Sequence, residues 1–220
     1  MLAFRHQFKA NNRNRSPQLD TVFQMGYNSG MDLKKPARIV SEIFNGFVMM
    51  ILTPSIAALV SDTALIYKIL IPIVYLAITI IPFAILRKLG KVSDYEFTKR
   101  EERPLYFTIV TVGYLLLFIL FSLLTKEPTI SLATLALFTT SCVLTMVTLY
   151  WKMSGHMTYS TLFFFTLLFL FPKVSFLPLI FIFTPLIATS RVILKKHTIW
   201  QTIIGTLVCA TISILIYWVI

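Results

Sequence analysis

Long apolar runs separated by short polar breaks fill the chain from residue 37 to its end. Most runs reach the roughly 18 residues that a helix needs to cross a hydrocarbon core about 30 Å thick. Helices are required in such a core because no water is present to satisfy an open backbone. The pattern predicts seven membrane-spanning helices, at residues 37–60, 64–86, 105–125, 129–151, 157–171, 174–190 and 199–220.

The boundary between the fifth and sixth spans is the weakest feature of this pattern. Only Phe171-Pro172-Lys173 separates two short apolar runs. Because proline ends or kinks a helix, residues 157–190 form either two spans or one kinked helix. The pattern is interpreted as two spans, which places the loops after the second, fourth and sixth spans on the face of the N-terminus.

The composition excludes an ordinary soluble domain. The 220 residues are 57% hydrophobic and 13% charged, with a mean hydropathy of +0.80, whereas soluble domains are about 25% charged. Cys142 and Cys209 lie inside apolar runs, with no second cysteine nearby to suggest a metal or redox motif. The predicted fold class is an all-α, polytopic transmembrane helical bundle.

The chain divides into two segments by polarity. Residues 1–36 are polar and basic, with an Asn/Arg-rich stretch at 11–15 and no apolar period, which predicts a flexible basic N-terminal tail. Residues 37–220 show no internal repeat and are predicted to form one membrane domain.

The basic residues are distributed unequally between the two predicted membrane faces. The loops after the second, fourth and sixth spans return to the face of the N-terminus, and most of the 20 Lys and Arg residues lie there, with Lys126 and Lys173 opposite. By the positive-inside rule this face is cytoplasmic. The sequence therefore predicts a multi-pass membrane protein with a cytoplasmic N-terminus.

Two of the polar segments on that face precede helices. Arg103-Pro104 opens the third span, where proline suits the first helical turn. Ser154-Gly155-His156 precedes the fifth span, where free backbone N–H groups and a glycine favour the close approach of an anion. A solvated loop with basic anchors, or an interfacial histidine without a function, is the simpler interpretation of each motif alone.

The third segment joins the last two spans. Ser190-Arg191 end the sixth span, while His197 and Gln201 are four residues apart at the start of the last helix and share one face. Arginine offers a planar fork that matches phosphate oxygens, and a histidine moves protons near neutral pH. The alternative is that Arg191 and the lysines beside it only mark the ends of two helices.

Together these motifs resemble those of the type 2 phosphatidic acid phosphatase superfamily, which is related to bacterial acid phosphatases and vanadium haloperoxidases. The family pattern is a Lys seven positions before Arg-Pro, then Pro-Ser-Gly-His, then Ser-Arg, five residues, His, three residues and Asp. Residues 37–220 match it in order at Arg103-Pro104, Ser154-Gly155-His156, Ser190-Arg191 and His197. They depart from it at three positions, where Glu96 replaces Lys, Met153 replaces Pro and Gln201 replaces Asp.

The resemblance implies a six-helix phosphatase-like core, here with one extra span, that hydrolyses a membrane lipid phosphate or diphosphate without a cofactor. His197 is the implied nucleophile, which forms a phosphohistidine, and His156 is the implied acid and base. Gln201 would orient His197, because its carbonyl fixes the ring tautomer without adding charge. The implied substrate-binding residues are Arg103, Arg191, Ser154 and Gly155, with Lys99 or Arg100 in place of the missing lysine.

The implied partner is a phosphorylated lipid within the bilayer, with no nucleic acid and no metal, since the three loops lack a His/Cys/Asp/Glu cluster with metal-ligand spacing. The alternative function is a catalytically silent relative that binds or moves anionic lipids, which the departures at Glu96 and Gln201 keep open. A helical membrane scaffold is a third possibility. Glu42 and Asn45, one turn apart in the first span, are expected to face the bundle interior, either in a structural hydrogen bond or behind the site.

Overall fold

A computed structural model describes residues 33–219, which form helices and no strands. The all-α class is therefore confirmed for this part of the chain. The predicted flexible tail lies almost entirely outside the described residues. Its predicted boundary at residue 36 is slightly late, because the first described helix, α3, spans Lys34–Ile43 and includes Pro36.

Within residues 33–219, five helical segments are long and apolar enough to cross a membrane, as a multi-pass protein requires. They are the combined run of α3 and α4 (Gly46–Val60), α5 (Leu65–Lys88), α6 (Arg103–Leu124) with the short η2 (Arg100–Glu102) before it, α7 (Pro128–Tyr150), and α10 (Ile199–Ile214) with η3 (Leu215–Val219) after it. Two shorter apolar helices, α8 (Gly155–Leu170) and α9 (Leu177–Ile193), complete the described chain.

Residues 157–190 form two helices rather than one kinked helix. A break at Phe171 separates α8 from α9. With 16 and 17 residues, these helices are about 24–26 Å long at 1.5 Å per residue. They are therefore shorter than a typical hydrocarbon core of about 30 Å.

The first predicted span is not continuous, and this corrects the expectation of one helix over 37–60. Asn45 has extended backbone angles (φ −62°, ψ 137°), and its side chain accepts a hydrogen bond from the Phe47 N–H at 2.9 Å. Asparagine favours this capping position because its side chain satisfies a backbone donor that the first helical turn leaves free. The helix is therefore interrupted at Phe44 and Asn45, and α3 contacts α9.

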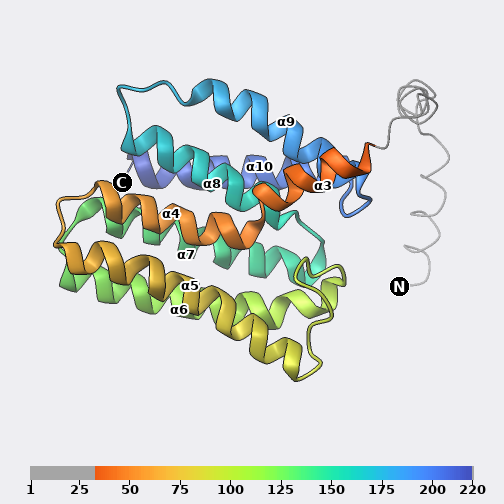
Figure 1. The fold of residues 1–220 in the computed structure, drawn as a ribbon, viewed down its shortest axis with the longest axis horizontal. Helices are drawn as coiled ribbons and strands as arrows, with labels where there is room; N and C mark the ends of the chain where they lie inside the picture. The colour runs from red at the N-terminus through yellow and green to blue at the C-terminus, as the bar shows by residue number, and fades with distance from the viewer. Residues whose placement is uncertain (1–32, 220) are drawn as a thin grey trace.

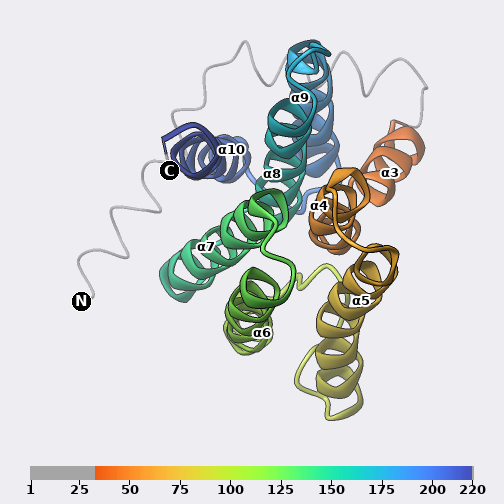
Figure 2. The same ribbon diagram turned by 90° about the vertical axis from the view of Figure 1, so that its left-hand side faces the viewer.

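From α4 to α10 the helices run alternately in opposite directions, as Figure 1 shows. As a result, α4, α6, α8 and α10 all begin at the same end of the bundle, where the loops after α5, α7 and α9 also lie. Figure 2 shows α8 in the centre, with α4, α7, α9 and α10 around it. The prediction that the three polar loops share one end of the bundle is confirmed.

The segment before α8 reaches below the start of α10. A Cβ atom on Gly205, two turns into α10, would lie 3.2 Å from the carbonyl oxygen of Ser154. The Ser154 N–H also donates to the carbonyl of Gln201 at 3.3 Å. The absence of a side chain at Gly205 thus allows the start of α8 to lie recessed between its neighbours.

Candidate active site

The loop over residues 89–99, between α5 and η2, is anchored by apolar side chains. Val92 and Phe97 are each 3% exposed, and the Phe97 ring lies 4.6 Å from that of Tyr106. Phe97 has a left-handed backbone (φ 49°), which is strained for a bulky residue and persists where packing holds it. Asp94 accepts a hydrogen bond from the Glu96 N–H at 2.9 Å, so the backbone on both sides of Glu96 is held.

Arg103 links this loop to the segment before α8. Its Nε donates to the Phe97 carbonyl at 2.9 Å, and its Nη1 donates to the Met153 carbonyl at 2.8 Å. The side chain is almost completely buried and lines the pocket described below. Arg103 therefore holds the loops together in addition to placing a positive charge at the site.

Two helices start side by side at the site. Ser154 caps α8 by accepting a hydrogen bond from the Met157 N–H, and Asn45 caps α4. A Cβ atom on Gly46 would lie 3.6 Å from the carbonyl of Gly155, so the first residues of α4 and α8 are in close contact. Both helix N-termini contribute partial positive charge to the pocket, which favours an anion.

The position of His197 is set by the start of α10. The Thr198 N–H donates to Gln201 Oε1 at 3.1 Å, and the Gln201 N–H donates to Thr198 Oγ1 at 3.3 Å. These two bonds form a capping box. The same Oε1 lies 3.2 Å from His197 Nδ1; because a carbonyl oxygen only accepts, Nδ1 carries the ring proton and Nε2 keeps its lone pair.

The surroundings of His197 keep its ring neutral. Burial, and then the positive charges of Arg103, Arg191 and Lys152, lower the pKa of the imidazole far below its ordinary value of 6.5. At neutral pH the ring is therefore a base with a free Nε2, which is the form that a nucleophilic histidine needs.

Arg191, at the end of α9, is the most deeply buried charged side chain among residues 33–219, with 0% exposure. Its Nη1 donates to Ser41 Oγ and to Glu96 Oε1, the latter at 2.7 Å, and lies 3.4 Å from His156 Nε2. A guanidinium only donates, so His156 Nε2 acts as the acceptor in this arrangement. Arg191 thus joins α3, α8 and the loop over 89–99.

Glu96 completes this charged cluster. Its Oε1 pairs with Arg191 and its Oε2 with Lys196. Burial acts to raise the pKa of Glu96, but the hydrogen bonds from Lys196 and Arg191 outweigh it and lower that pKa below 4.5. Glu96 is therefore an ionised carboxylate at neutral pH, held between two cations.

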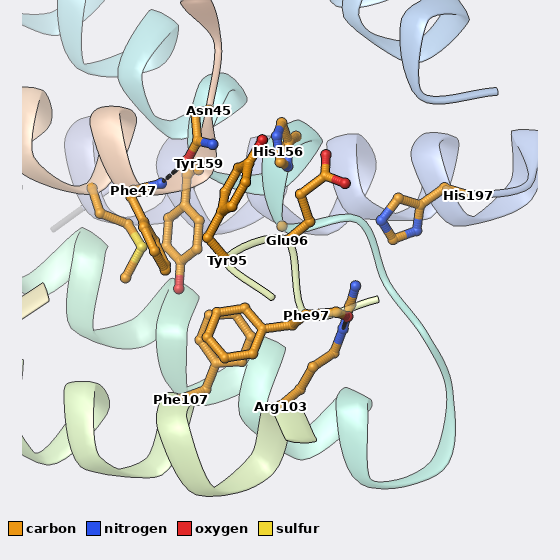
Figure 3. A pocket seen from close by; sticks show the side chains of 13 residues that line it. Asn45, Phe47, Tyr95, Glu96, Phe97, Arg103, Phe107, His156, Tyr159 and His197 are labelled. Atoms are coloured by element: carbon orange, nitrogen blue, oxygen red, sulfur yellow. Dashed lines mark hydrogen bonds between the residues drawn. The ribbon is translucent and has the colours of Figure 1, made fainter. Parts of the chain in front are cut away.

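These residues surround one small pocket, shown in Figure 3. The lining includes Arg103, His156 and His197 from three different elements, together with Glu96 and Gly155. Its volume is about 30 Å³, which is enough for a water molecule, since a cavity needs roughly 10–15 Å³ to hold one. Figure 3 shows the Glu96 carboxylate pointing toward the side of the pocket where the two histidines lie.

Lys99 and Arg100, the expected substitutes for the family lysine, do not reach the pocket. Lys99 is paired with Glu102 at 3.7 Å, and its side chain is 68% exposed. Arg100 donates to the Leu149 carbonyl at 2.8 Å and pairs with Glu101. The prediction that Lys99 or Arg100 binds the substrate is therefore wrong. The reason is that η2, which begins directly after Lys99, directs both side chains along the outside of the bundle.

Two lysines that the sequence analysis did not select lie at the site instead. Lys196 contacts Glu96 and donates to Thr98 Oγ1 at 3.2 Å, and Lys152 donates to the Thr98 carbonyl at 3.1 Å. Burial, and then the positive charges of Arg103, Arg191 and Lys196, lower the pKa of Lys152. The sequence feature that could have indicated a role for Lys196 at the site is its position directly before His197.

The remaining predicted residues have mixed outcomes. Ser154 is buried and caps α8, so its hydroxyl is used for structure. Asn45 is buried, caps α4 and lines the pocket. The expectation that Glu42 faces the interior is wrong, because Glu42 is exposed and accepts a hydrogen bond from the Tyr95 hydroxyl.

No group of three or more His, Cys, Asp or Glu side chains within residues 33–219 is arranged to hold a metal ion. Cys142 and Cys209 are free thiols inside α7 and α10. No family model, no curated protein and no solved structure matches the chain.

Proposed function

We propose that this chain is a phosphatase of a membrane lipid phosphate or diphosphate that acts through a phosphohistidine on His197. The observation that carries the proposal is the Gln201–His197 contact. It leaves His197 Nε2 unprotonated in a pocket that also holds His156 and Arg103. A neutral imidazole beside buried cations is the combination that attack on a phosphorus atom requires.

The reaction divides into two displacements. In the first, His197 Nε2 attacks phosphorus and the bond from phosphorus to the lipid oxygen breaks. His156, which is neutral without substrate, would take a proton from the incoming phosphate monoanion and pass that proton to the leaving oxygen. In the second, His156 takes a proton from water, the water oxygen attacks phosphorus, and the phosphorus–nitrogen bond breaks to release phosphate. Arg103, Arg191 and Lys196 would stabilise the charge on the phosphate oxygens in both steps.

An apolar groove supports a lipid substrate. It has a volume of about 480 Å³ between α8, α9 and α10, and its lining includes Met157, Thr202 and Ala188. Met157, which lines the groove, directly follows the pocket residue His156 in α8, so the groove lies next to the pocket along this helix. We assign the groove to the hydrocarbon chain of the substrate. Filling it with Ala188→Phe should raise KM for a long-chain substrate and leave hydrolysis of a short-chain one unchanged.

The direct test is phosphate release in detergent from a panel of phosphatidate, phosphatidylglycerophosphate and polyprenyl diphosphate, with a chelator present. We expect release from at least one of them, inhibition by vanadate, and trapping of a radiolabelled phosphohistidine. Activity that returns only when a divalent cation is added would argue for a different mechanism.

The active-site end of the bundle is proposed to face the cytoplasm, because the basic loops lie there. Lys91, exposed in the loop after α5, is a suitable labelling position. A Lys91→Cys protein in intact cells should resist an impermeant thiol reagent and react after the membrane is opened. Reaction in intact cells would reverse the orientation.

A second function is favoured by one observation, the presence of Glu96 between Arg191 and Lys196. A carboxylate in this position satisfies the cations without a substrate, as expected of a catalytically silent relative that binds or moves anionic lipids. Binding of phosphatidate vesicles without phosphate release and without a phosphohistidine would favour this function.

A further inference from the structure

The contacts of Glu96 match those that a phosphate group would make. One carboxylate oxygen lies 2.7 Å from Arg191 Nη1 and the other contacts Lys196 Nζ. Arg191 is wholly buried, and a buried guanidinium strongly requires an anionic partner. Glu96 is therefore the anion that now balances the site.

The pocket beside this carboxylate has room for about one water molecule, whereas a phosphate group has five heavy atoms. Within residues 33–219, Arg191 Nε has no hydrogen-bond partner although it is buried. A buried donor without a partner is uncommon and marks a place where a further acceptor can bind. The site thus has both an unused donor and an anionic occupant.

We propose that Glu96 is a resident anion that competes with the phosphate group for Arg191 and Lys196, and that it swings outward when a phosphate binds. The inference rests on the proposed function only in taking a phosphate group as the ligand. It assigns to Glu96 the control of phosphate affinity at this site.

The local structure permits this motion. The backbone around Glu96 is held by Asp94 and by the buried Phe97, so a change of side-chain rotamer is sufficient. The Glu96 side chain is 12% exposed and that of Lys196 is 31% exposed, which leaves a route to solvent. When a phosphate takes its place, the charge of Arg191 remains balanced.

The experiment compares binding of inorganic phosphate to the full-length protein, purified in detergent, by titration calorimetry. Glu96→Gln removes the competing charge and should tighten binding by about tenfold or more, since a charge pair near 4 Å is worth several kcal/mol even at moderate dielectric. Glu101→Gln is the matched control, because Glu101 is a 75% exposed carboxylate near the same loop. The control should remain within about twofold of the unmodified protein.

Glu96→Asp provides a second variant, because its shorter side chain cannot reach both cations; intermediate affinity is expected. It keeps the test decisive if Glu96→Gln does not fold. Phosphate binding that is unchanged or undetectable in the folded Glu96 variants, or equal tightening by Glu101→Gln, would overturn the proposal.

A parallel arm uses dihexanoyl phosphatidate. Tightening for both ligands supports a lipid phosphate as the natural ligand, and tightening for inorganic phosphate alone supports free phosphate. Hydrolysis is measured on the same samples. Tighter binding of both ligands, with no phosphate release from any lipid of the panel, would retain the role of Glu96 and reject the phosphatase, so the two proposals fail separately.

Discussion

Buried polar side chains in the helix interior and at the active-site end are satisfied in different ways. Within the helices, neutral hydroxyl groups pair at 2.7–3.0 Å, in Tyr75–Thr134, Thr79–Tyr114, Ser141–Tyr159 and Thr166–Tyr217. At the end where α4, α6, α8 and α10 begin, Arg103, Arg191, Glu96, His156 and His197 gather instead. Tyr75 and Arg191 are equally buried, both at 0% exposure.

The difference follows from the cost of burial. A hydroxyl pair satisfies itself and is tolerated in an apolar interior, where interhelical hydrogen bonds contribute about 0.6–2 kcal/mol. A buried charge needs an opposite charge and further donors or acceptors, which only the helix starts and their loops provide. The interior pairs are therefore expected to serve stability, and the charged end to serve function.

The strongest test of this division is His197→Ala. If His197 forms the phosphoenzyme, turnover should fall by about a thousandfold or more, because loss of a nucleophile removes a whole step. The control Tyr217→Phe, which removes an interior hydroxyl, should leave turnover unchanged. Phosphate release with a saturating lipid substrate measures both, and equal losses in the two variants would contradict the division.

Arg103→Lys tests the charged end in a way that separates charge from geometry. Lysine keeps the charge but cannot donate to the Phe97 and Met153 carbonyls in a planar fork. We expect turnover to fall by about tenfold to a hundredfold and the free energy of unfolding to fall by about 1–3 kcal/mol.

Tyr75→Phe is the interior counterpart of Arg103→Lys. It removes one hydrogen bond and should lower the free energy of unfolding by about 1 kcal/mol with no change in turnover. Denaturation in detergent and phosphate release measure the two effects. Full activity in Arg103→Lys would show that Arg103 serves only to hold the loops.

The sequence predicts the architecture well because hydropathy alone decides where helices cross a membrane. It misplaces the break in the first span, since Asn45 lies inside an apolar run and its capping role depends on a local backbone choice that hydropathy does not report. It also misplaces Lys99 and Arg100. They match the family lysine in charge, whereas their direction depends on the short η2 helix.

The spacing of the sequence motifs predicts only part of the site. The motifs place Arg103, His156, Arg191 and His197 at one end, and the structure brings them together. The role of Glu96 could not be predicted from the motifs, because a glutamate in the position of a lysine indicates the loss of a contact. Its pairing with Arg191 and Lys196 is visible only in the folded loop. Thr198 and Gln201 match the capping-box pattern, so that role was available from the sequence.

Acid sensitivity is a further consequence of burying His197 in its neutral form. Its folded pKa lies below the unfolded value of 6.5, so below about pH 6.5 the unfolded state binds a proton that the folded state does not. The free energy of unfolding should therefore fall with decreasing pH, by at most about 1.4 kcal/mol per pH unit from this group. The charged and titratable groups that face this ring must be the same in any two proteins whose stability is compared. They are Arg103, Arg191, Lys152, Lys196, Glu96 and His156.

His197→Gln should reduce that slope, measured as the free energy of unfolding at several pH values between about 5 and 7.5. Glu96 titrates below 4.5 and does not contribute strongly in this range. An identical slope in His197→Gln would mean that the imidazole of His197 has the same pKa in the folded and unfolded states.

The smallest expected effect, and the finest test of the charged end, is Gln201→Glu. Gln201 Oε1 serves two donors at once, the His197 ring and the Thr198 N–H, and glutamate keeps both the length of the side chain and the capping box. It adds a negative charge beside the imidazole, which stabilises the cationic ring of the phosphohistidine step, and hydrogen bonds to charged groups are stronger by about 1 kcal/mol. Turnover should rise by about three- to tenfold, while Thr198→Ala, which weakens the cap but leaves the Gln201–His197 contact, should lower stability with little change in turnover. A Gln201→Glu protein that is stable yet no faster would show that position 201 serves the helix start alone, and the silent-relative function would then be favoured if His197→Ala also proved harmless.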